Sequence, residues 1–256
     1  MTAAQNLRVI LALSRRALNE ILRVPGGAIP GVLAPAIFMV GLSGVFGAAS
    51  QLPGFDASDF RTFIVPVGML QGAGFTGAAT GVNLARDIER GWFDRLLTGP
   101  APRIVLLIGI VSSASLRALL PATFLLLLAL ALGVHVQSVP GLVLAFLIVM
   151  LFAAALACWG CVVALRFGTQ QAAPLMQIVA FASILFTTAY APEALLAGWL
   201  ADIASVNPVT YVLEGVRQAF VYGLTWDRTW HALLALALLL LALGSGAIAM
   251  MRRVGR

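Results

Sequence analysis

Cys158 and Cys161, in the segment CWGC, have the spacing of a redox-active cysteine pair. The segment lies inside a long apolar run, and the sequence has no second cysteine pair. Free cysteine is among the residues most often buried in protein cores. We therefore interpret the pair as two small side chains packed within a helix. The two histidines, His135 and His231, lie at the ends of different apolar runs, which argues against a metal site built on them.

The acidic residues are also not arranged for catalysis or ion coupling. All ten lie outside the cores of the apolar runs: Glu20, Asp56, Asp59, Asp87, Glu89, Asp94, Glu193, Asp202, Glu214 and Asp227. An ion-driven carrier usually keeps a carboxylate near the bilayer midplane, so the sequence disfavours that class. Lysine is absent, and a phosphate-binding GxxxxGK[ST] loop therefore cannot form. We expect no catalytic residue, no metal site and no nucleotide or other cofactor bound by this chain.

The composition predicts an all-α integral membrane protein. The 256 residues are 61% hydrophobic and 10% charged, whereas soluble domains are about half apolar and about a quarter charged. Such a chain must bury its apolar surface in lipid. Six apolar runs reach or exceed the length of a crossing, and we expect one transmembrane domain over 1–256 that contains them. The predicted spans are 28–49, 62–84, 104–132, 140–165, 172–191 and 229–251.

Residues 5–23 have the pattern of an amphipathic helix that lies in the membrane surface. Leucine and isoleucine side chains fall on one face, and arginine, asparagine and glutamate fall on the other. Pro25, Gly26 and Gly27 are expected to end this helix. Arginines interrupt the apolar part of the segment, so it does not resemble a cleaved signal peptide.

The arginine distribution predicts that both termini are cytosolic. Six crossings place the termini on the same side. With the termini inside, twelve arginines are cytosolic: Arg8, Arg15, Arg16, Arg23, Arg86, Arg90, Arg95, Arg103, Arg166, Arg252, Arg253 and Arg256. Arg61, Arg217 and Arg228 are then the three outside. Arg117, the remaining arginine, falls in the inner leaflet, where it could extend toward the headgroups or serve a function within the membrane.

The segment RDIERGWFDRLLTGPAPR, residues 86–103, carries seven charges between two apolar runs. Wound as one helix over 86–97, it gathers its apolar side chains on one face. These are Ile88, Trp92, Phe93, Leu96 and Leu97. Glu89 falls among them, where a carboxylate needs a partner, and Gly91 falls on the polar face. Aromatic residues interspersed with charges are typical of protein interfaces, so we predict a docking helix for a soluble cytosolic protein. The alternative is a helix that only anchors the chain at the membrane surface through Trp92.

Residues 192–228 are too polar for a span and too apolar for an ordinary loop. The pattern predicts an outer hairpin of two short helices, broken at Asn207 and Pro208 and reaching into the outer leaflet. Glu214 and Arg217 are three residues apart and can pair on one helical face. The simplest interpretation is an ordinary surface ion pair worth well under ~1 kcal/mol. In the second span, glycines at 68, 72, 77 and 81 form two small-xxx-small pairs, which favour close helix packing inside the protein over a dimer face.

Taken together, these features resemble the permeases of type-2 ATP-binding-cassette exporters of the daunorubicin-resistance or polysaccharide-export kind. The residues that carry the resemblance are RDIERGWFDRLLTGPAPR, the long third span with Arg117, and the outer segment NPVTYVLEGVRQAF. The resemblance covers essentially the whole chain, although no single motif in it is strict.

The resemblance implies several functional assignments. The helix over 86–97 would be the coupling helix that sits in a groove of the ATPase subunit, with Glu89, Gly91 and Leu97 at the most recognisable positions. The N-terminal helix would flank the ATPase contact. Asn207, Pro208, Glu214 and Arg217 would belong to an outer lid over the pathway. The assembly would contain two permeases, identical or related, and two soluble ATPase subunits that bind ATP and Mg.

The leading interpretation is therefore a permease subunit that exports a hydrophobic or amphipathic cargo, such as a drug, a lipid or a glycoconjugate, across the cytoplasmic (inner) membrane. The spans carry no charged recognition site for cargo, and no nucleic-acid partner is expected. Three alternatives remain. A membrane scaffold or sensor that transports nothing is the one that the sequence excludes least. An ion-coupled carrier lacks its midplane carboxylate, and a membrane-bound enzyme such as a lipid transferase lacks a catalytic cluster.

Overall fold

The computed structural model describes residues 2–23, 29–52, 55, 57 and 59–254, which form helices and turns without a strand in these ranges. This confirms the predicted all-α class. The α-helices are α1 (Ala3–Arg23), α2 (Ile29–Val45), α3 (Phe60–Glu89), α4 (Trp92–Leu97), α5 (Arg103–Ala131), α6 (Val139–Phe167), α7 (Ala173–Leu185), α8 (Gly198–Val206), α9 (Pro208–Arg217) and α10 (Trp226–Arg253). Short 3₁₀ turns cover Gly47–Gln51, Gln170–Ala172 and Glu193–Leu195, and a π turn covers Gln218–Tyr222.

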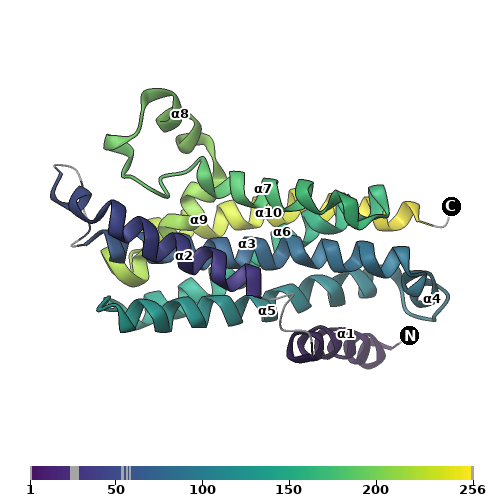
Figure 1. The fold of residues 1–256 in the computed structure, drawn as a ribbon. Coiled ribbons are helices and arrows are strands. Elements are labelled where there is room, and N and C mark those ends of the chain that lie inside the picture. Colours follow the sequence, from purple (N-terminus) through teal and green to yellow (C-terminus); the bar gives the residue numbers. More distant parts are fainter. Residues whose placement is uncertain (1, 24–28, 53–54, 56, 58, 255–256) are drawn as a thin grey trace.

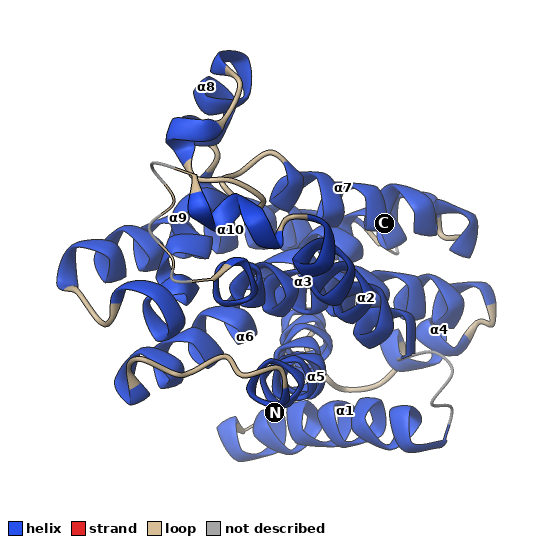
Figure 2. Cartoon of the chain, turned by 60° about the vertical axis from the view of Figure 1, so that its left-hand side comes forward, coloured by secondary structure: helices blue, strands red, loops and turns tan. Residues whose placement is uncertain are grey.

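The long helices run side by side, with α3 and α6 at the centre of the bundle (Figure 1). The N-terminal helix α1, the short helix α4 and the C-terminus lie at one end of this bundle, and α8 and α9 lie at the other. In Figure 2 the bundle is seen more nearly end-on, and α1 lies crosswise to α5, on which it packs. An amphipathic helix crosswise to the bundle fits the prediction for residues 5–23.

The predicted spans all correspond to helices, but these helices differ in length. Among the described residues, α5, α6 and α10 are long and apolar enough to cross a bilayer by length and composition. The apolar stretches Gly31–Val45 and Gln170–Leu185 are shorter. The 30-residue helix α3 is less apolar because of its glycines and Gln71. The count of six crossings therefore remains a prediction. The long third run is one continuous helix, α5, and its first part carries α1.

Three of the five glycines of the second span allow α3 to approach neighbouring helices closely. A Cβ atom on Gly81 would lie 2.4 Å from the Cα of Gly160 in α6, and one on Gly77 would lie 2.6 Å from the carbonyl oxygen of Ala153. A Cβ on Gly72 would lie 2.9 Å from Pro121 in α5. These glycines therefore serve packing within the chain, as the sequence predicts. Cys158 and Cys161 are buried in α6 as free thiols, in agreement with their interpretation as packing residues.

Candidate functional site

The charged segment after α3 is not one helix. Residues 86–89 continue α3, and the chain breaks at Gly91, whose φ of 67° lies in the left-handed region that favours glycine. A new helix, α4, spans only Trp92–Leu97, and the amide of Thr98 closes it on the carbonyl of Asp94. The prediction of a single helix over 86–97 is therefore wrong. The break changes the direction of the backbone between α3 and α4. Ile88 and Glu89 therefore do not share a helical face with Trp92 and Phe93.

The aromatic residues of α4 face their own protein. Phe93 is 1% exposed and packs in the core, so the prediction that it fills a groove of a partner is wrong in this conformation. Leu96 and Leu97 are half-buried against the same core. A six-residue helix cannot bury such side chains by itself, and the end of the bundle provides the nearest apolar surface. The outward side of α4 consists instead of Asp94 and Arg95, which are exposed.

A polar clamp joins α4 to the N-terminal helix. The guanidinium of Arg16 donates to both carboxylate oxygens of Asp87, at 3.0 and 3.2 Å. It also lies over the ring of Trp92, with Cζ 3.5 Å from the ring centroid. Two N–H bonds to one carboxylate, together with a cation–π contact, fix the direction of the Arg16 side chain. We call Arg16, Asp87 and Trp92 the α1 clamp. It connects the first helix to the α3–α4 corner.

A second contact joins the same corner to the junction between α6 and α7. The carboxylate of Glu89 accepts hydrogen bonds from the Thr169 hydroxyl at 2.7 Å, the Gln170 backbone amide at 2.8 Å and the Gln170 side chain. The hydrogen bonds from Gln170 and Thr169 hold the pKa of this carboxyl below its ordinary value of 4.5. Glu89 is exposed and already has donors within its own chain. The prediction that it sits on an apolar face and needs a donor from a partner protein is therefore corrected.

Arg117 is 7% exposed in α5. Its Nη2 donates to the hydroxyl of Thr80 in α3 at 2.6 Å, and its Nε donates to the carbonyl of Ser113, one turn back toward the start of α5, at 3.3 Å. The side chain thus bends toward the end of the bundle that carries α1 and α4 (Figure 1). Its place in the inner leaflet remains a prediction.

At the other end of the bundle, Asn207 connects two helices. Its side-chain oxygen caps α9 by accepting from the amide of Val209 at 2.9 Å. Its side-chain nitrogen donates to the carbonyls of Ser183 and Phe186, where α7 ends. Pro208 occupies the first turn of α9, where a missing N–H costs nothing. The predicted break at Asn207 and Pro208 is confirmed, and it also satisfies carbonyls at the end of α7.

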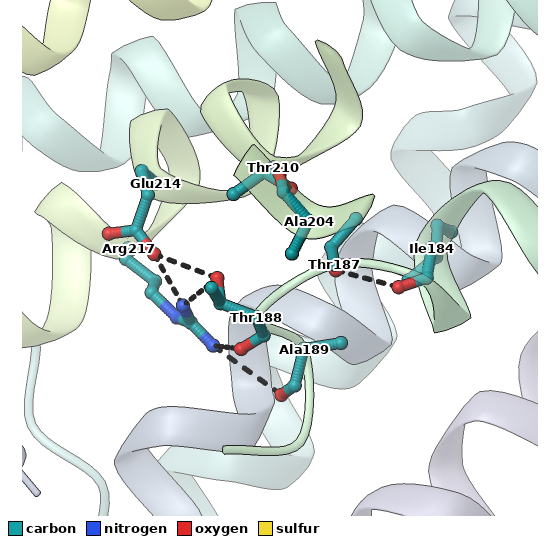
Figure 3. A network of polar contacts seen from close by, with 8 residues as sticks. All are labelled: Ile184, Thr187, Thr188, Ala189, Ala204, Thr210, Glu214 and Arg217. Atoms are coloured by element: carbon teal, nitrogen blue, oxygen red, sulfur yellow. Dashed lines mark hydrogen bonds and ion pairs between the residues drawn. The ribbon is translucent and has the colours of Figure 1, made fainter. Parts of the chain in front are cut away.

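Arg217 pairs with Glu214 as predicted, but the pair is not an ordinary surface one (Figure 3). Arg217 is 1% exposed, and its Cζ lies 3.9 Å from the ring centroid of Phe63. Its guanidinium also donates to the hydroxyl of Thr188 at 3.0 Å and to the carbonyl of Thr188 at 2.6 Å. The prediction of an exposed pair is therefore wrong. The amphipathic pattern of α9 cannot show that the chain after α7 folds over the arginine.

Apart from the Glu214–Arg217 pair, sequence reasoning missed the partners in these contacts. Arg16 and Asp87 are 71 residues apart, and Thr169 is 80 residues from Glu89. Gln218 is fully buried, and its side-chain oxygen accepts a hydrogen bond from the Thr225 amide at 2.7 Å. This bond joins the π turn to the start of α10. The sequence offers one general indication of such contacts. A polar residue within an otherwise apolar run must find a hydrogen-bond partner, but its spacing does not identify that partner.

Comparisons with known proteins identify the family of this chain. Residues 8–221 match the family model described as ABC-2 type transporter. YbhR of Escherichia coli K12, named as a multidrug ABC transporter permease, is 26% identical over 201 residues, which cover 76% of this chain and 53% of the relative. The transport permease ycf38 of Porphyra purpurea is 28% identical over 229 residues, 87% of this chain and 77% of the relative. The ycf38 of Cyanophora paradoxa is 26% identical over 224 residues, covering 85% and 75%.

The chain spans about half the length of the E. coli relative. The family match nevertheless covers most of the chain and includes the α3–α4 corner, α5, α8 and α9. Members of this family are multi-pass membrane subunits of ABC transporters and are not themselves enzymes. The chain belongs to the ABC-2 type transporter family.

Proposed function

We propose that this chain is the permease subunit of an ATP-driven exporter, which moves a hydrophobic or amphipathic cargo outward across the cytoplasmic membrane. A soluble ATP-binding-cassette subunit would bind ATP and Mg, and a second permease would complete the pathway. Efflux of drugs, and hence antibiotic resistance, is the variant that the multidrug name of the E. coli relative suggests. The observation that carries the proposal is the α3–α4 corner, which contacts the body of the protein on two sides and exposes a charged tip.

This corner can transmit a displacement of α4. Asp94 and Arg95 form the exposed tip that would contact the ATPase, and Gly91 is the bend behind it. The α1 clamp connects the corner to α1, and Glu89 connects it to the α6–α7 junction. A partner that binds one position of α4 more tightly would therefore bias the positions of several helices at once. We include Asn207, Pro208, Glu214 and Arg217 as the base of an outer lid that responds to this bias.

Cross-linking tests the proposed partner contact. With Cys158 and Cys161 replaced by alanine, single cysteines at Asp94 and Thr98 are expected to cross-link to the co-expressed cognate ATPase. A cysteine at Ser205, which is exposed in α8 at the opposite end, is the matched control and should give no such product. Cross-linking from Ser205 but not from Asp94 would reject the proposed coupling surface.

Glu89→Ala is expected to fold and to keep its ATPase partner, yet to lose about tenfold in cargo-stimulated ATP hydrolysis. The three hydrogen bonds that Glu89 accepts from the α6–α7 junction disappear, whereas the bond from Arg86 to Gln170 remains. Coupling between sites is typically worth ~1–3 kcal/mol. Arg95→Ala removes a single exposed charge from the tip that contacts the ATPase and should change the rate by less than about twofold. ATPase assays on reconstituted complexes would compare the two variants. If Glu89→Ala behaves like wild type while Arg95→Ala fails, the tip alone carries the coupling.

The orientation is tested by labelling intact cells with an impermeant thiol reagent, again with Cys158 and Cys161 replaced. Cysteines placed at Thr225 and Ser205 should react, because the arginine bias puts that end outside. Cysteines placed at Gln5 and Thr98 should react only after the cells are permeabilised. The opposite pattern would invert the topology and remove α4 from the cytosol.

A further inference from the structure

Helix α1 has one side packed on α5 and a second apolar side that is open. On the packed side the helices approach closely, since a Cβ atom on Gly109 of α5 would lie 2.6 Å from the Leu13 side chain, and Ser14 is only 4% exposed. On the open side Leu7 and Leu11 are 56% and 58% exposed. These two leucines lie about 40° apart around the helix and form an apolar stripe. The packing of α1 on the bundle therefore leaves this stripe uncovered.

The α1 clamp shows which way the stripe points. At about 100° per residue, Arg16 lies on the opposite side of α1 from Leu7. Its guanidinium binds Asp87 at the α3–α4 corner, at one end of the bundle (Figure 1). The leucine stripe therefore points away from this corner, toward the level of the long apolar helices. At the start of α5, Ile104 and Ile108 are also exposed, so lipid that covers α5 there would reach the stripe as well.

Two arginines lie beside the stripe. Arg8 and Arg15 are exposed and about two turns apart, so they share one side of α1. Within the part of the chain that the structure describes, neither guanidinium has an ion pair or a hydrogen bond, whereas that of Arg16 is paired with Asp87. Amphipathic helices with arginines beside an apolar face bind bilayers, and each basic residue near the surface adds attraction to anionic lipids. The open side of α1 has both of these features.

We propose that the open side of α1 binds an anionic bilayer surface, with Leu7 and Leu11 among the acyl chains and Arg8 and Arg15 on anionic headgroups. The long arginine side chains can extend from the apolar level to the phosphates. Because Arg16 of the same helix holds Asp87, a bilayer bound here also supports the α3–α4 corner. The proposal adds a lipid class to the predicted position of α1 in the membrane surface. It rests neither on export nor on the orientation of the chain.

Local lipid quenching in proteoliposomes tests this preference. With Cys158 and Cys161 replaced by alanine, a bimane-labelled cysteine at Ala4, which is exposed one turn before Arg8, reports the lipids beside α1. Phosphatidylcholine and phosphatidylglycerol, each brominated in turn on its acyl chains, give the relative affinity of the two lipids at this position. The parent protein should prefer phosphatidylglycerol at least about fivefold, the effect expected of one arginine near the surface. Arg8→Gln combined with Arg15→Gln should lower the preference to less than about twofold.

Arg90→Gln combined with Arg95→Gln is the matched control. This double variant removes the same charge from exposed positions on the α3–α4 corner and should change the preference by less than about twofold. Equal losses in the two double variants would reduce the preference to the net charge of the chain and overturn the proposal.

The remaining outcomes are also decisive. A preference that survives the loss of Arg8 and Arg15 would overturn the role of these arginines. If neither brominated lipid quenches the label at Ala4, something other than lipid covers the open side of α1, and the proposal is wrong. Should the double variant not be recovered, the parent protein still gives an answer, because about 1 M salt screens exposed charges and should remove the preference. A preference that this salt concentration leaves unchanged would contradict binding through exposed arginines.

Discussion

Gly81→Val is expected to abolish folding of this permease. The Cβ atom would meet the Cα, carbonyl carbon and oxygen of Gly160 at 2.4–2.5 Å, and a backbone cannot move aside as a flexible side chain can. Overpacking a well-packed core typically costs 1–3 kcal/mol and occasionally more, so we expect about 3 kcal/mol or above. Helices α3 and α6 form the centre of the bundle, so their separation would affect every helix packed on them. The measurement is the amount of monodisperse protein recovered in mild detergent, together with its thermal unfolding midpoint.

Gly41→Val provides the matched control. Gly41 is exposed on α2, and nothing lies within 4 Å of the position that its Cβ would occupy. This variant should be recovered at close to the wild-type level. Gly68→Ala should also be tolerated, because the nearest atom would lie 3.7 Å away, an ordinary contact. Wild-type stability of Gly81→Val would mean that α3 and α6 do not cross as closely as the structure shows.

Arg217→Ala is expected to destabilise the end of the bundle that carries α9 by about 3 kcal/mol or more. The substitution leaves Glu214, the Thr188 hydroxyl and the Thr188 carbonyl without their common donor, and breaking one half of a buried pair typically costs 3–5 kcal/mol. It also removes the cation above Phe63. The irregular segment after α7 would then lose its hydrogen bonds from Arg217 to Thr188 and Ala189, and it should become sensitive to protease. Limited proteolysis of the reconstituted protein, combined with thermal unfolding, would measure this.

Two further variants distinguish a buried network from a loss of positive charge. Arg61→Ala removes an arginine at the same end, but Arg61 is half-exposed and lies 3.8 Å from its partner Asp59, so the expected cost is below about 1 kcal/mol. Arg217→Lys keeps the charge but has one nitrogen in place of the separate Nη1 and Nη2 that contact Glu214 and Thr188, and should be intermediate. Equal stability of Arg61→Ala and Arg217→Ala would show that the network contributes little.

The sequence by itself determined the class of this protein and the approximate positions of its helices. An apolar run in lipid must satisfy its own backbone, so composition and run length are enough to predict helices. The break at Asn207 and Pro208 and the internal packing role of the glycines also follow from local backbone chemistry. The resemblance carried by the charged segment after the second span indicated the correct family, since it depends on the order of motifs along the chain.

Only the tertiary structure decided which side chains meet. Gly91 breaks the predicted coupling helix, which turns Phe93 inward and leaves Asp94 and Arg95 outside. Glu89 and Arg217 were assigned the wrong surroundings because their partners come from the α6–α7 junction and from the chain after α7. Helical periodicity defines the face of a single helix, whereas burial depends on what packs against that face. The α1 clamp exists only because α1, α3 and α4 meet at one end of the bundle, and no spacing within the chain encodes that meeting.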